Sequence, residues 1–265
     1  AWLPVSAGSF CPPQLLDAIP DGVFRQIEEA KGRLAGKLPK GCEKYIAYFQ
    51  SYTNTYAPLP YLERLFSSAL SHPDIAALSI GTRPDCLPQE TIELLARLNS
   101  QKPVWVELGL QTIHESSAAF IRRGYSLDCF LDAFSRLRTA GLTVIVHVIL
   151  GLPGEDREMM LQTVRFLGDL KVDGIKLQLL HILSGTDLGE LYQTRPFPVM
   201  EMDEYLDLVV DCIASLPPSV VIHRISGDGP KRLLIAPLWS GNKRLVLNSM
   251  ARRFKERGIS QGDFL

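Results

Sequence analysis

Cysteine is scarce in this 265-residue chain, and the five cysteines that it has are far apart in the sequence. They are Cys11, Cys42, Cys86, Cys129 and Cys212. Because no two of them form a Cys-x-x-Cys pair, the sequence indicates neither a zinc site nor a redox pair, and we predict no metal ligand within it. An odd number of widely spaced cysteines is typical of a reducing compartment, so we expect a cytoplasmic protein.

The chain also lacks the segments that would place it in a membrane. No apolar run reaches membrane-spanning length, and the N-terminus has no charged start followed by an apolar core, as a signal peptide would. A net charge of −1 provides no overall field that would attract nucleic acid or an anionic membrane. The first residue is Ala1 rather than methionine, and we therefore expect a cropped or processed chain.

Short apolar runs alternate with amphipathic stretches along most of the sequence. The apolar runs predict strands near 45–50, 76–81, 104–109, 143–150, 174–180 and 220–225. The amphipathic stretches predict helices at 61–70, 89–98, 127–139, 157–170, 201–216 and 242–257, and a further helical region within 12–34. This alternation is typical of a parallel α/β sheet with helices outside. We predict a barrel over residues 1–216 and a C-terminal extension over 217–265 that packs on it.

Polar side chains collect where the first two of these strands end. Residues 48–55 read Tyr-Phe-Gln-Ser-Tyr-Thr-Asn-Thr, and residues 81–85 read Gly-Thr-Arg-Pro-Asp. In a parallel α/β barrel, the carboxyl ends of the strands carry the binding groups. The alternatives are structural: the Ser, Thr and Asn side chains would cap the next helix, and Arg83 would pair with Asp85.

The next predicted strand carries a carboxylate and ends in a glutamine, within Glu-Leu-Gly-Leu-Gln-Thr (107–112). Glu107 lies on the same side of the strand as Trp105, because residues two apart share a face. A carboxylate inside a barrel is costly unless it is paired or bound to a ligand. Two arginines follow; we interpret Arg122 as solvated, whereas Arg123 could reach the same end of the barrel.

Histidines stand near the ends of three later strands, and one of these strands leads into a glycine-rich loop. His147 precedes Gly-Leu-Pro-Gly-Glu (151–155) by four residues, while His181 and His223 follow other strands. A lone histidine on an apolar strand is commonly a core residue, but the position of His147 favours a role at the loop. That loop lacks the phosphate-binding and dinucleotide-binding spacings, so its backbone is predicted to line the edge of a flat ligand.

Taken in order, these motifs resemble those of the radical S-adenosylmethionine (radical SAM) superfamily, and most closely a YhcC-like family within it. The similarity extends to Asp-Gly-Ile-Lys-Leu (173–177) and His-Arg-Ile (223–225), and it runs from about Ser9 to the basic C-terminal helix. It implies an α/β fold, a partial six-stranded (β/α)6 TIM-like barrel of the radical SAM type. We expect the first strand and the cluster loop of that barrel to be missing.

The resemblance implies two cofactors, S-adenosylmethionine and a 4Fe–4S cluster, which give a 5′-deoxyadenosyl radical for hydrogen abstraction, and an external one-electron donor. The residues expected to bind cofactor are Gln50, Thr53, Asn54, Thr55, Thr82, Arg83, Glu107, Gln111, Arg123, His147, Gly151 and Pro153. Gln111 and His147 suit hydrogen bonds to ribose or carboxylate, and Arg123 suits the carboxylate. The resemblance identifies neither a catalytic residue nor a substrate.

The three thiolates that a cluster needs do not stand where the family has them. Cys11 lies beyond the family's last cluster position, and Trp2 and Val5 fall near its final Cys-x-x-Cys. We therefore expect the cluster ligands upstream of Ala1, and we expect the 265-residue chain to be inactive without them. Gln178 also stands where relatives commonly carry a histidine.

Two other functions compete with a radical enzyme. The first is a catalytically silent barrel that binds a nucleoside or a protein partner. The second is a conventional β/α-barrel lyase or isomerase that uses Glu107, His147 and Lys176 as acids and bases. A nucleic-acid partner has weak support from the basic C-terminal helix, whose charges more commonly form a solvated face.

Overall fold

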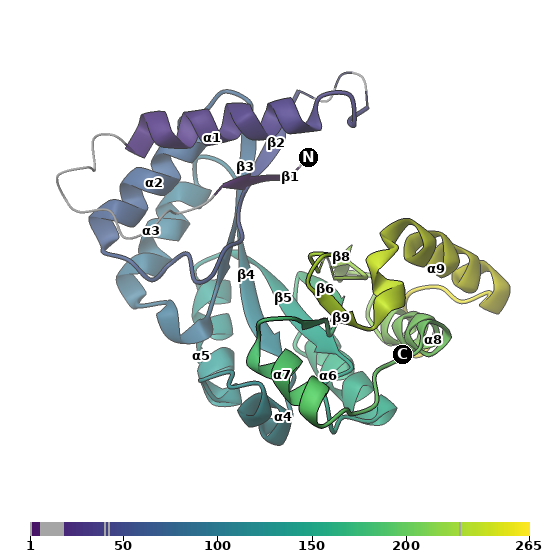
Figure 1. Ribbon diagram of the computed structural model, residues 1–265. Helices are drawn as coiled ribbons and strands as arrows, with labels where there is room; N and C mark the ends of the chain where they lie inside the picture. Colours follow the sequence, from purple (N-terminus) through teal and green to yellow (C-terminus); the bar gives the residue numbers. More distant parts are fainter. Residues whose placement is uncertain (1, 6–18, 40, 42, 228) are drawn as a thin grey trace. The chain divides into compact units, whose positions relative to one another are not determined.

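A computed structural model describes residues 2–5, 19–39, 41, 43–227 and 229–265 (Figure 1). Cys11 and Cys42 lie outside the described residues, so the expectations that involve them stay predictions. The first helix, α1 (Ile19–Leu34), covers the described part of the helical region predicted within 12–34. This helix is continuous through Gly22.

Among the described residues, the main sheet has seven strands, which follow one another in chain order. They are β1 (Trp2–Val5), β2 (Tyr45–Phe49), β3 (Ile75–Thr82), β4 (Val104–Gln111), β5 (Thr143–Leu150), β6 (Gly174–Leu179) and β8 (Val221–Arg224). The pairings β1–β2, β2–β3, β3–β4 and β6–β8 are parallel. The six predicted strands and the parallel α/β class are confirmed.

Strand β1 is a finding that the sequence pattern did not predict. It pairs Trp2 with Ile46 and Val5 with Phe49 at the edge of the sheet. It adds an edge strand ahead of the first strand that we predicted, near 45–50. Four residues are too few to show a period, and Pro4 argues against a central strand, although an edge strand tolerates proline.

Helices fill the connections between the parallel strands, as right-handed crossovers require. They are α2 (Leu59–Ser71), α3 (Gln89–Asn99), α4 (Glu115–Phe120), α5 (Leu127–Thr139), α6 (Arg157–Asp169), α7 (Asp187–Thr194) and α8 (Met202–Ala214), with a 3-10 turn, η2 (Pro84–Cys86), before α3. Local caps fix three of the starts: Ser126 accepts from the Cys129 N–H at α5, Asp156 accepts from the Met159 N–H at α6, and Thr186 accepts from the Gly189 N–H at α7. The predicted helices are confirmed, whereas the short helices α4 and α7 were not predicted.

The chain divides into two compact units by its internal contacts. Unit 1 comprises residues 1–109 and 125–145, and unit 2 comprises residues 110–124 and 146–265. In unit 1, Phe49 of β2 meets Phe66 of α2 edge to face, with ring centroids 5.1 Å apart. Because side chains alternate along a strand, Tyr48 points to the opposite face of the sheet. We call that opposite face of β2–β4 the inner face.

Unit 2 ends in smaller elements around β8. A two-stranded antiparallel sheet pairs β7 (Ile182–Leu183) with β9 (Leu234–Ala236), and a 3-10 turn, η3 (Leu238–Gly241), follows β9. The last helix, α9 (Lys243–Arg257), ends at Gly258, whose left-handed φ of 61° is typical of a C-cap glycine. The predicted division between residues 216 and 217 stays a prediction.

Helix α9 packs against α8 through ion pairs. Three aspartates stand one helical turn apart on α8, at Asp203, Asp207 and Asp211. Arg253 donates to Asp203 and Asp207, both at 2.5 Å, and Arg257 donates to Asp211 at 2.6 Å. Part of the basic charge of this helix is therefore paired within unit 2 rather than solvated.

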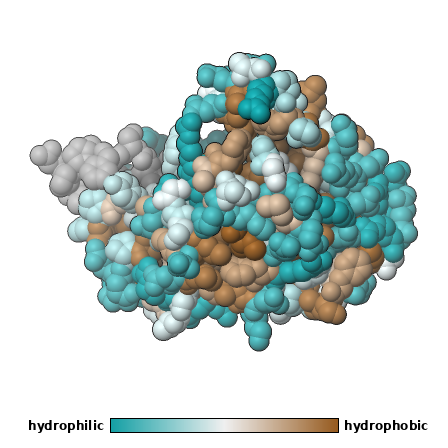
Figure 2. All heavy atoms as spheres, turned by 90° about the horizontal axis from the view of Figure 1, so that it is seen from below, coloured by the Kyte–Doolittle hydropathy of each residue, from teal (hydrophilic) through white to brown (hydrophobic). Residues whose placement is uncertain are grey.

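No helix in the described part of the chain combines the length and the apolar character that crossing a membrane requires. The surface seen in Figure 2 mixes hydrophilic and hydrophobic residues, and the hydrophobic ones gather in separate patches. Most globular surfaces have this mixed composition, because polar residues alone cannot cover a domain.

Candidate functional site

The loop after β2 in unit 1 is locked to the end of β3. The Asn54 side-chain amide donates to the Phe49 and Gly81 carbonyls at 2.9 Å each, and the Asn54 N–H donates to Gly81 at 3.1 Å. Asn54 is buried. Helix α2 begins after Pro58 without a side-chain cap, so the alternative that these polar residues cap the next helix is wrong.

Thr55 and Thr82 form a second link between the same two loops. The Thr55 hydroxyl donates to the Cys86 carbonyl at 2.5 Å, and its oxygen lies 2.5 Å from the Thr82 hydroxyl. Because Thr55 has a single hydroxyl proton, Thr82 is the donor of the pair. Both side chains are buried, whereas Gln50 is exposed and Thr53 is half-buried. Among the predicted residues of this loop, these last two are therefore the ones that a ligand can reach.

Arg83 and Asp85 pair with each other, as the structural alternative predicted. The guanidinium donates to both carboxylate oxygens, at 2.9 and 2.7 Å, and lies 5.2 Å from the ring centroid of Tyr125. The hydrogen bonds from Arg83 hold the pKa of Asp85 below its ordinary value. This two-point contact gives Arg83 a defined orientation, although the site remains partly exposed.

Glu107 occupies the inner face of unit 1 and is 1% exposed. Its carboxylate accepts hydrogen bonds from the Tyr48 hydroxyl at 2.8 Å and from the Ser79 hydroxyl at 2.6 Å. These three residues stand on neighbouring strands, β2, β3 and β4. These two hydroxyl donors offset part of the free-energy cost of burying the carboxylate. They explain how Glu107 can stand inside the fold, as its position in the sequence predicted.

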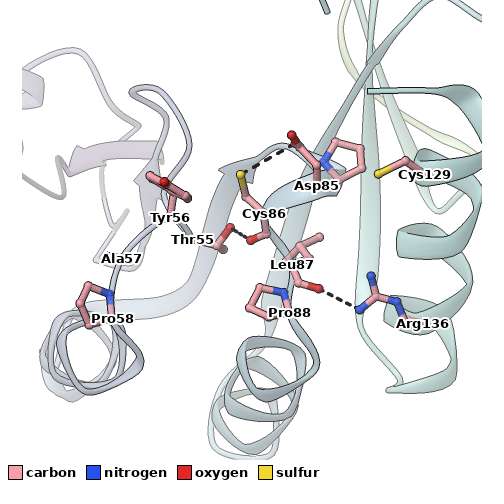
Figure 3. A pocket seen from close by; sticks show the side chains of 11 residues that line it. Thr55, Tyr56, Ala57, Pro58, Asp85, Cys86, Leu87, Pro88, Cys129 and Arg136 are labelled. Atoms are coloured by element: carbon pink, nitrogen blue, oxygen red, sulfur yellow. Dashed lines mark hydrogen bonds between the residues drawn. The ribbon is translucent and has the colours of Figure 1, made fainter. Parts of the chain in front are cut away.

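Unit 1 also contains a pocket of about 600 Å³, shown in Figure 3. Its walls come from three places: the segment before α2, the turn η2 with the start of α3, and helix α5. The lining residues are Thr55, Tyr56, Ala57, Pro58, Pro84, Asp85, Cys86, Leu87, Pro88, Cys129 and Arg136. The volume falls within the range of small-molecule sites. Of the predicted site residues, Thr55 alone lines this pocket.

The sequence motifs did not point to Arg136 or Cys129 as pocket residues. Arg136 donates to the Leu87 carbonyl at 2.8 Å and to Asp132 at 2.8 Å, which ties α5 to the turn before α3. Burial raises the pKa of the Cys86 thiol, so this thiol stays protonated at neutral pH. Arg136 and Cys129 both lie in α5, whose sequence is that of an ordinary amphipathic helix, so no sequence signal marks them as pocket residues.

In unit 2, Gln111 stands at the end of β4 with a left-handed backbone, at a φ of 71°. Arg123 is buried beside it. One guanidinium nitrogen of Arg123 donates to the Thr112 carbonyl at 2.7 Å and to the Leu110 carbonyl at 3.4 Å, and the other donates to Glu115 at 2.8 Å. The two carbonyls that flank Gln111 are therefore held by a single side chain.

The glycine-rich loop of unit 2 is tied to the same turn. The Thr112 hydroxyl donates to Glu155 at 2.6 Å, and it accepts from the His114 N–H at 3.1 Å. Gly151 and Gly154 have φ values of 85° and 88°, a conformation that a side chain disfavours. The motifs at 107–112 and 151–155 thus meet in one hydrogen-bonded network.

His147 of β5 lies beside Gln178 of β6. The Gln178 side-chain nitrogen is 3.3 Å from His147 Nδ1, and both side chains are half-buried. If this amide donates to Nδ1, the neutral imidazole carries its proton on Nε2 and presents it as a donor. Pro153 is also half-buried, and Lys176, two residues before Gln178, is buried on the same strand.

The described residues contain one group whose ligand atoms are close enough for a metal ion, Glu28, His72 and Asp74. The Lys31 ammonium lies 2.8 Å from Glu28 and 2.6 Å from Asp74. His72 accepts from the Asp74 N–H at Nδ1, and its Nε2 lies 3.0 Å from Glu28. An ammonium therefore stands where a cation would, and the group is an ion-pair cluster between α1 and the segment after α2.

A 4Fe–4S cluster does not fit the cysteines in the described part of the chain. These are Cys86, Cys129 and Cys212, and no cysteine belongs to a group with metal-ligand spacing there. Cys212 is fully buried in unit 2, and burial raises the pKa of its thiol to about 12. A cluster needs converging thiolates, which these three thiols do not supply.

The comparison with known families agrees with the parallel α/β sheet and with these strand-end motifs. The model of the radical SAM superfamily matches residues 9–167, and that of the radical SAM C-terminal domain matches residues 172–256. The first match covers more than half of the chain. The chain belongs to the radical SAM superfamily.

Individual relatives confirm the YhcC-like resemblance. The uncharacterized protein YtqA of Bacillus subtilis (strain 168) is 43% identical over 244 residues, which cover 92% of this chain and 75% of YtqA. Protein YhcC of Escherichia coli (strain K12) is 37% identical over 242 residues, which cover 91% of this chain and 78% of YhcC.

Among solved structures, the archaeal Methanocaldococcus infernus Elp3 with an N-terminal deletion is similar, with a TM-score of 0.77. The alignment covers 98% of this chain at 20% identity, and it spans 64% of the Elp3 chain, which is less than two thirds. This similarity shows the fold, which is that of a radical SAM enzyme.

Proposed function

We propose that this chain binds S-adenosylmethionine at its strand ends and serves as the barrel of a radical SAM enzyme that abstracts hydrogen from a substrate. This cofactor, when bound and reduced by one electron from an external donor, would supply the 5′-deoxyadenosyl radical and release methionine. The proposal rests chiefly on the network of unit 2, in which the turn at Gln111 is joined to the loop 151–155 through the Thr112–Glu155 hydrogen bond. Such a network preorganises polar groups before a ligand arrives.

The donor set of unit 2 suits a nucleoside with a polar tail. Gln111 offers an amide, and His147 offers an imidazole ring whose Nδ1 lies 3.3 Å from the Gln178 side-chain nitrogen. The loop 151–154 has two left-handed glycines, and a Cβ at Gly154 would meet nothing within 4 Å, so a flat ligand edge could approach its backbone there.

The 4Fe–4S cluster is not assigned to residues of this chain, because the described cysteines do not fit it. We therefore attribute no chemical step of this chain to a cluster. We expect that the purified 265-residue chain, after anaerobic treatment with iron and sulfide, lacks iron–sulfur absorption and forms no 5′-deoxyadenosine. An external one-electron donor remains part of the proposed enzyme.

Calorimetric titration with S-adenosylhomocysteine tests the proposal without requiring the cluster. We expect saturable binding that Gln111→Ala weakens by about tenfold, because one hydrogen bond to a polar ligand group is lost. The matched control is Gln101→Ala, an exposed glutamine after α3, which should leave the affinity unchanged. Absence of binding, or equal effects of both substitutions, would contradict the proposal.

A catalytically silent barrel that binds a nucleoside is the second candidate, and the absence of converging cysteine thiolates among the described residues favours it. It predicts the same titration result but no activity in any reconstitution. A lyase or isomerase that uses Glu107 would instead show activity without iron and without S-adenosylmethionine. A nucleic-acid substrate stays a prediction, and it loses support because Arg253 and Arg257 are paired with α8.

A further inference from the structure

The left-handed backbone of Gln111 requires an explanation. A side chain with a Cβ disfavours this region, and such residues persist where the surrounding structure holds them. The holding contacts are explicit here, because the carbonyls on both sides of Gln111 accept hydrogen bonds from the same nitrogen of Arg123. The Arg123 side chain is 1% exposed, so water does not compete for these bonds.

The distances explain how the contact favours a bent backbone. A nitrogen 2.7 Å from the Thr112 oxygen and 3.4 Å from the Leu110 oxygen requires these two oxygens to be no more than about 6 Å apart. Two residues of a regular strand span roughly 6.7 Å. The guanidinium therefore draws together two carbonyls that a straight strand would hold farther apart. The left-handed residue between them provides the bend.

We call the contact of Arg123 with the carbonyls of Leu110 and Thr112 the clamp. The second guanidinium nitrogen of Arg123 binds on the opposite side. It donates to Glu115 at 2.8 Å, at the start of α4, and the Arg123 N–H donates to Ala118 at 2.9 Å near the end of that helix. Arg123 thus joins the end of β4 to α4. A planar, two-ended donor is needed for this geometry, and lysine cannot reproduce it.

We propose that Arg123 is a positioning residue, which holds Gln111 in its left-handed conformation so that the Gln111 amide meets the ligand. It replaces the expectation that Arg123 binds the ligand carboxylate directly. The inference rests on the proposed function for the identity of the ligand. The clamp itself does not depend on any ligand.

The first test measures thermal unfolding without ligand. Arg123→Gln should lower the unfolding temperature, and the same substitution in a Gln111→Gly background should lower it by less than half as much, because glycine needs no help at this φ. The neighbouring Arg122, whose side chain is 79% exposed, is the matched control, and Arg122→Gln should shift the midpoint by less than about 2 °C. Equal losses in both backgrounds would overturn the clamp.

The second test compares the affinities of two nucleosides in calorimetric titrations of Arg123→Lys. This variant retains the positive charge, and it can be used if Arg123→Gln does not fold. S-adenosylhomocysteine has a carboxylate, and 5′-methylthioadenosine has none. A positioning role predicts that both affinities fall by a similar factor, on the order of tenfold. A loss confined to S-adenosylhomocysteine would make Arg123 a direct ligand and overturn the proposal. If the unmodified protein binds neither nucleoside, the proposed function fails, and the unfolding experiment alone decides the clamp.

Discussion

The strand-end loops of the two units use their polar side chains for different purposes. In unit 1, Asn54, Thr55 and Thr82 are buried, and their hydrogen bonds link one loop to the next. In unit 2, Gln111 and His147 stay half-buried, while neighbouring residues set the Gln111 backbone and the His147 ring. A motif residue can therefore shape a loop through its own hydrogen bonds.

The largest effect is expected from Glu107, which serves structure within unit 1. Glu107→Ala would leave the buried hydroxyls of Tyr48 and Ser79 without their acceptor, so we expect the free energy of unfolding to fall by about 3 kcal/mol. Urea unfolding measures it. Glu107→Gln keeps one oxygen acceptor and should cost less. A loss below about 1 kcal/mol for Glu107→Ala would show that the carboxylate does not stabilise the inner face.

The next effect separates buried from accessible residues within one loop. Asn54→Ala removes two donors from buried carbonyls and should lower the free energy of unfolding by about 2 kcal/mol. Gln50→Ala, four residues earlier and exposed, should change it by less than about 0.5 kcal/mol. Denaturant unfolding of both variants measures the difference. Similar losses for the two would remove the distinction on which the comparison depends.

A smaller effect is expected in unit 2, and it should appear in binding rather than in stability. Gln178→Leu removes the amide beside His147 Nδ1, so the ring loses one of the contacts that orient it. We expect the affinity for S-adenosylhomocysteine to fall by about fivefold, which corresponds to one hydrogen bond. Titration calorimetry measures it, and Gln101→Leu is an exposed control. An unchanged affinity would exclude Gln178 from the site.

The smallest effect is the pH dependence of stability that we expect from the ion pairs of Lys31 with Glu28 and Asp74. The hydrogen bond from Lys31 lowers the pKa of Glu28 below 4.5 and that of Asp74 below 3.8. Each carboxylate binds its proton more weakly in the folded state, so its stabilisation is present above those ordinary values and is lost as the pH falls through the folded pKa. We expect the unfolding temperature to fall below about pH 4. Lys31→Met should flatten that decline, and an unchanged slope would contradict the assignment.

Much of the fold was predictable because its signals are local. Six apolar runs at the expected spacing gave six strands, and the helix at 127–139 was predicted to the residue because its apolar residues recur at helical spacing. Strand β1 was missed because four residues show no period. The short helices α4 and α7 were missed for the same reason, since one or two turns carry no readable amphipathic face.

The site was less predictable, because its properties depend on contacts that are distant in sequence. The Arg-Pro-Asp spacing correctly offered an Arg83–Asp85 pair, since the two residues are neighbours. The clamp of Arg123 on the carbonyls around Gln111 depends on where α4 returns the chain, and no spacing encodes that return. The pocket residue Arg136 lies 49 residues from the Leu87 carbonyl that it contacts, so only the folded chain reveals it.

The buried thiol of Cys212 can be used to measure local unfolding of unit 2. Within the described part of the chain, Cys86 and Cys129 of unit 1 are partly accessible, whereas Cys212 is a fully buried residue of α8 in unit 2. A thiol reagent with mass spectrometric detection would label the two groups at different times. Because Cys212 reacts only when α8 opens, its labelling rate would measure how frequently unit 2 opens locally.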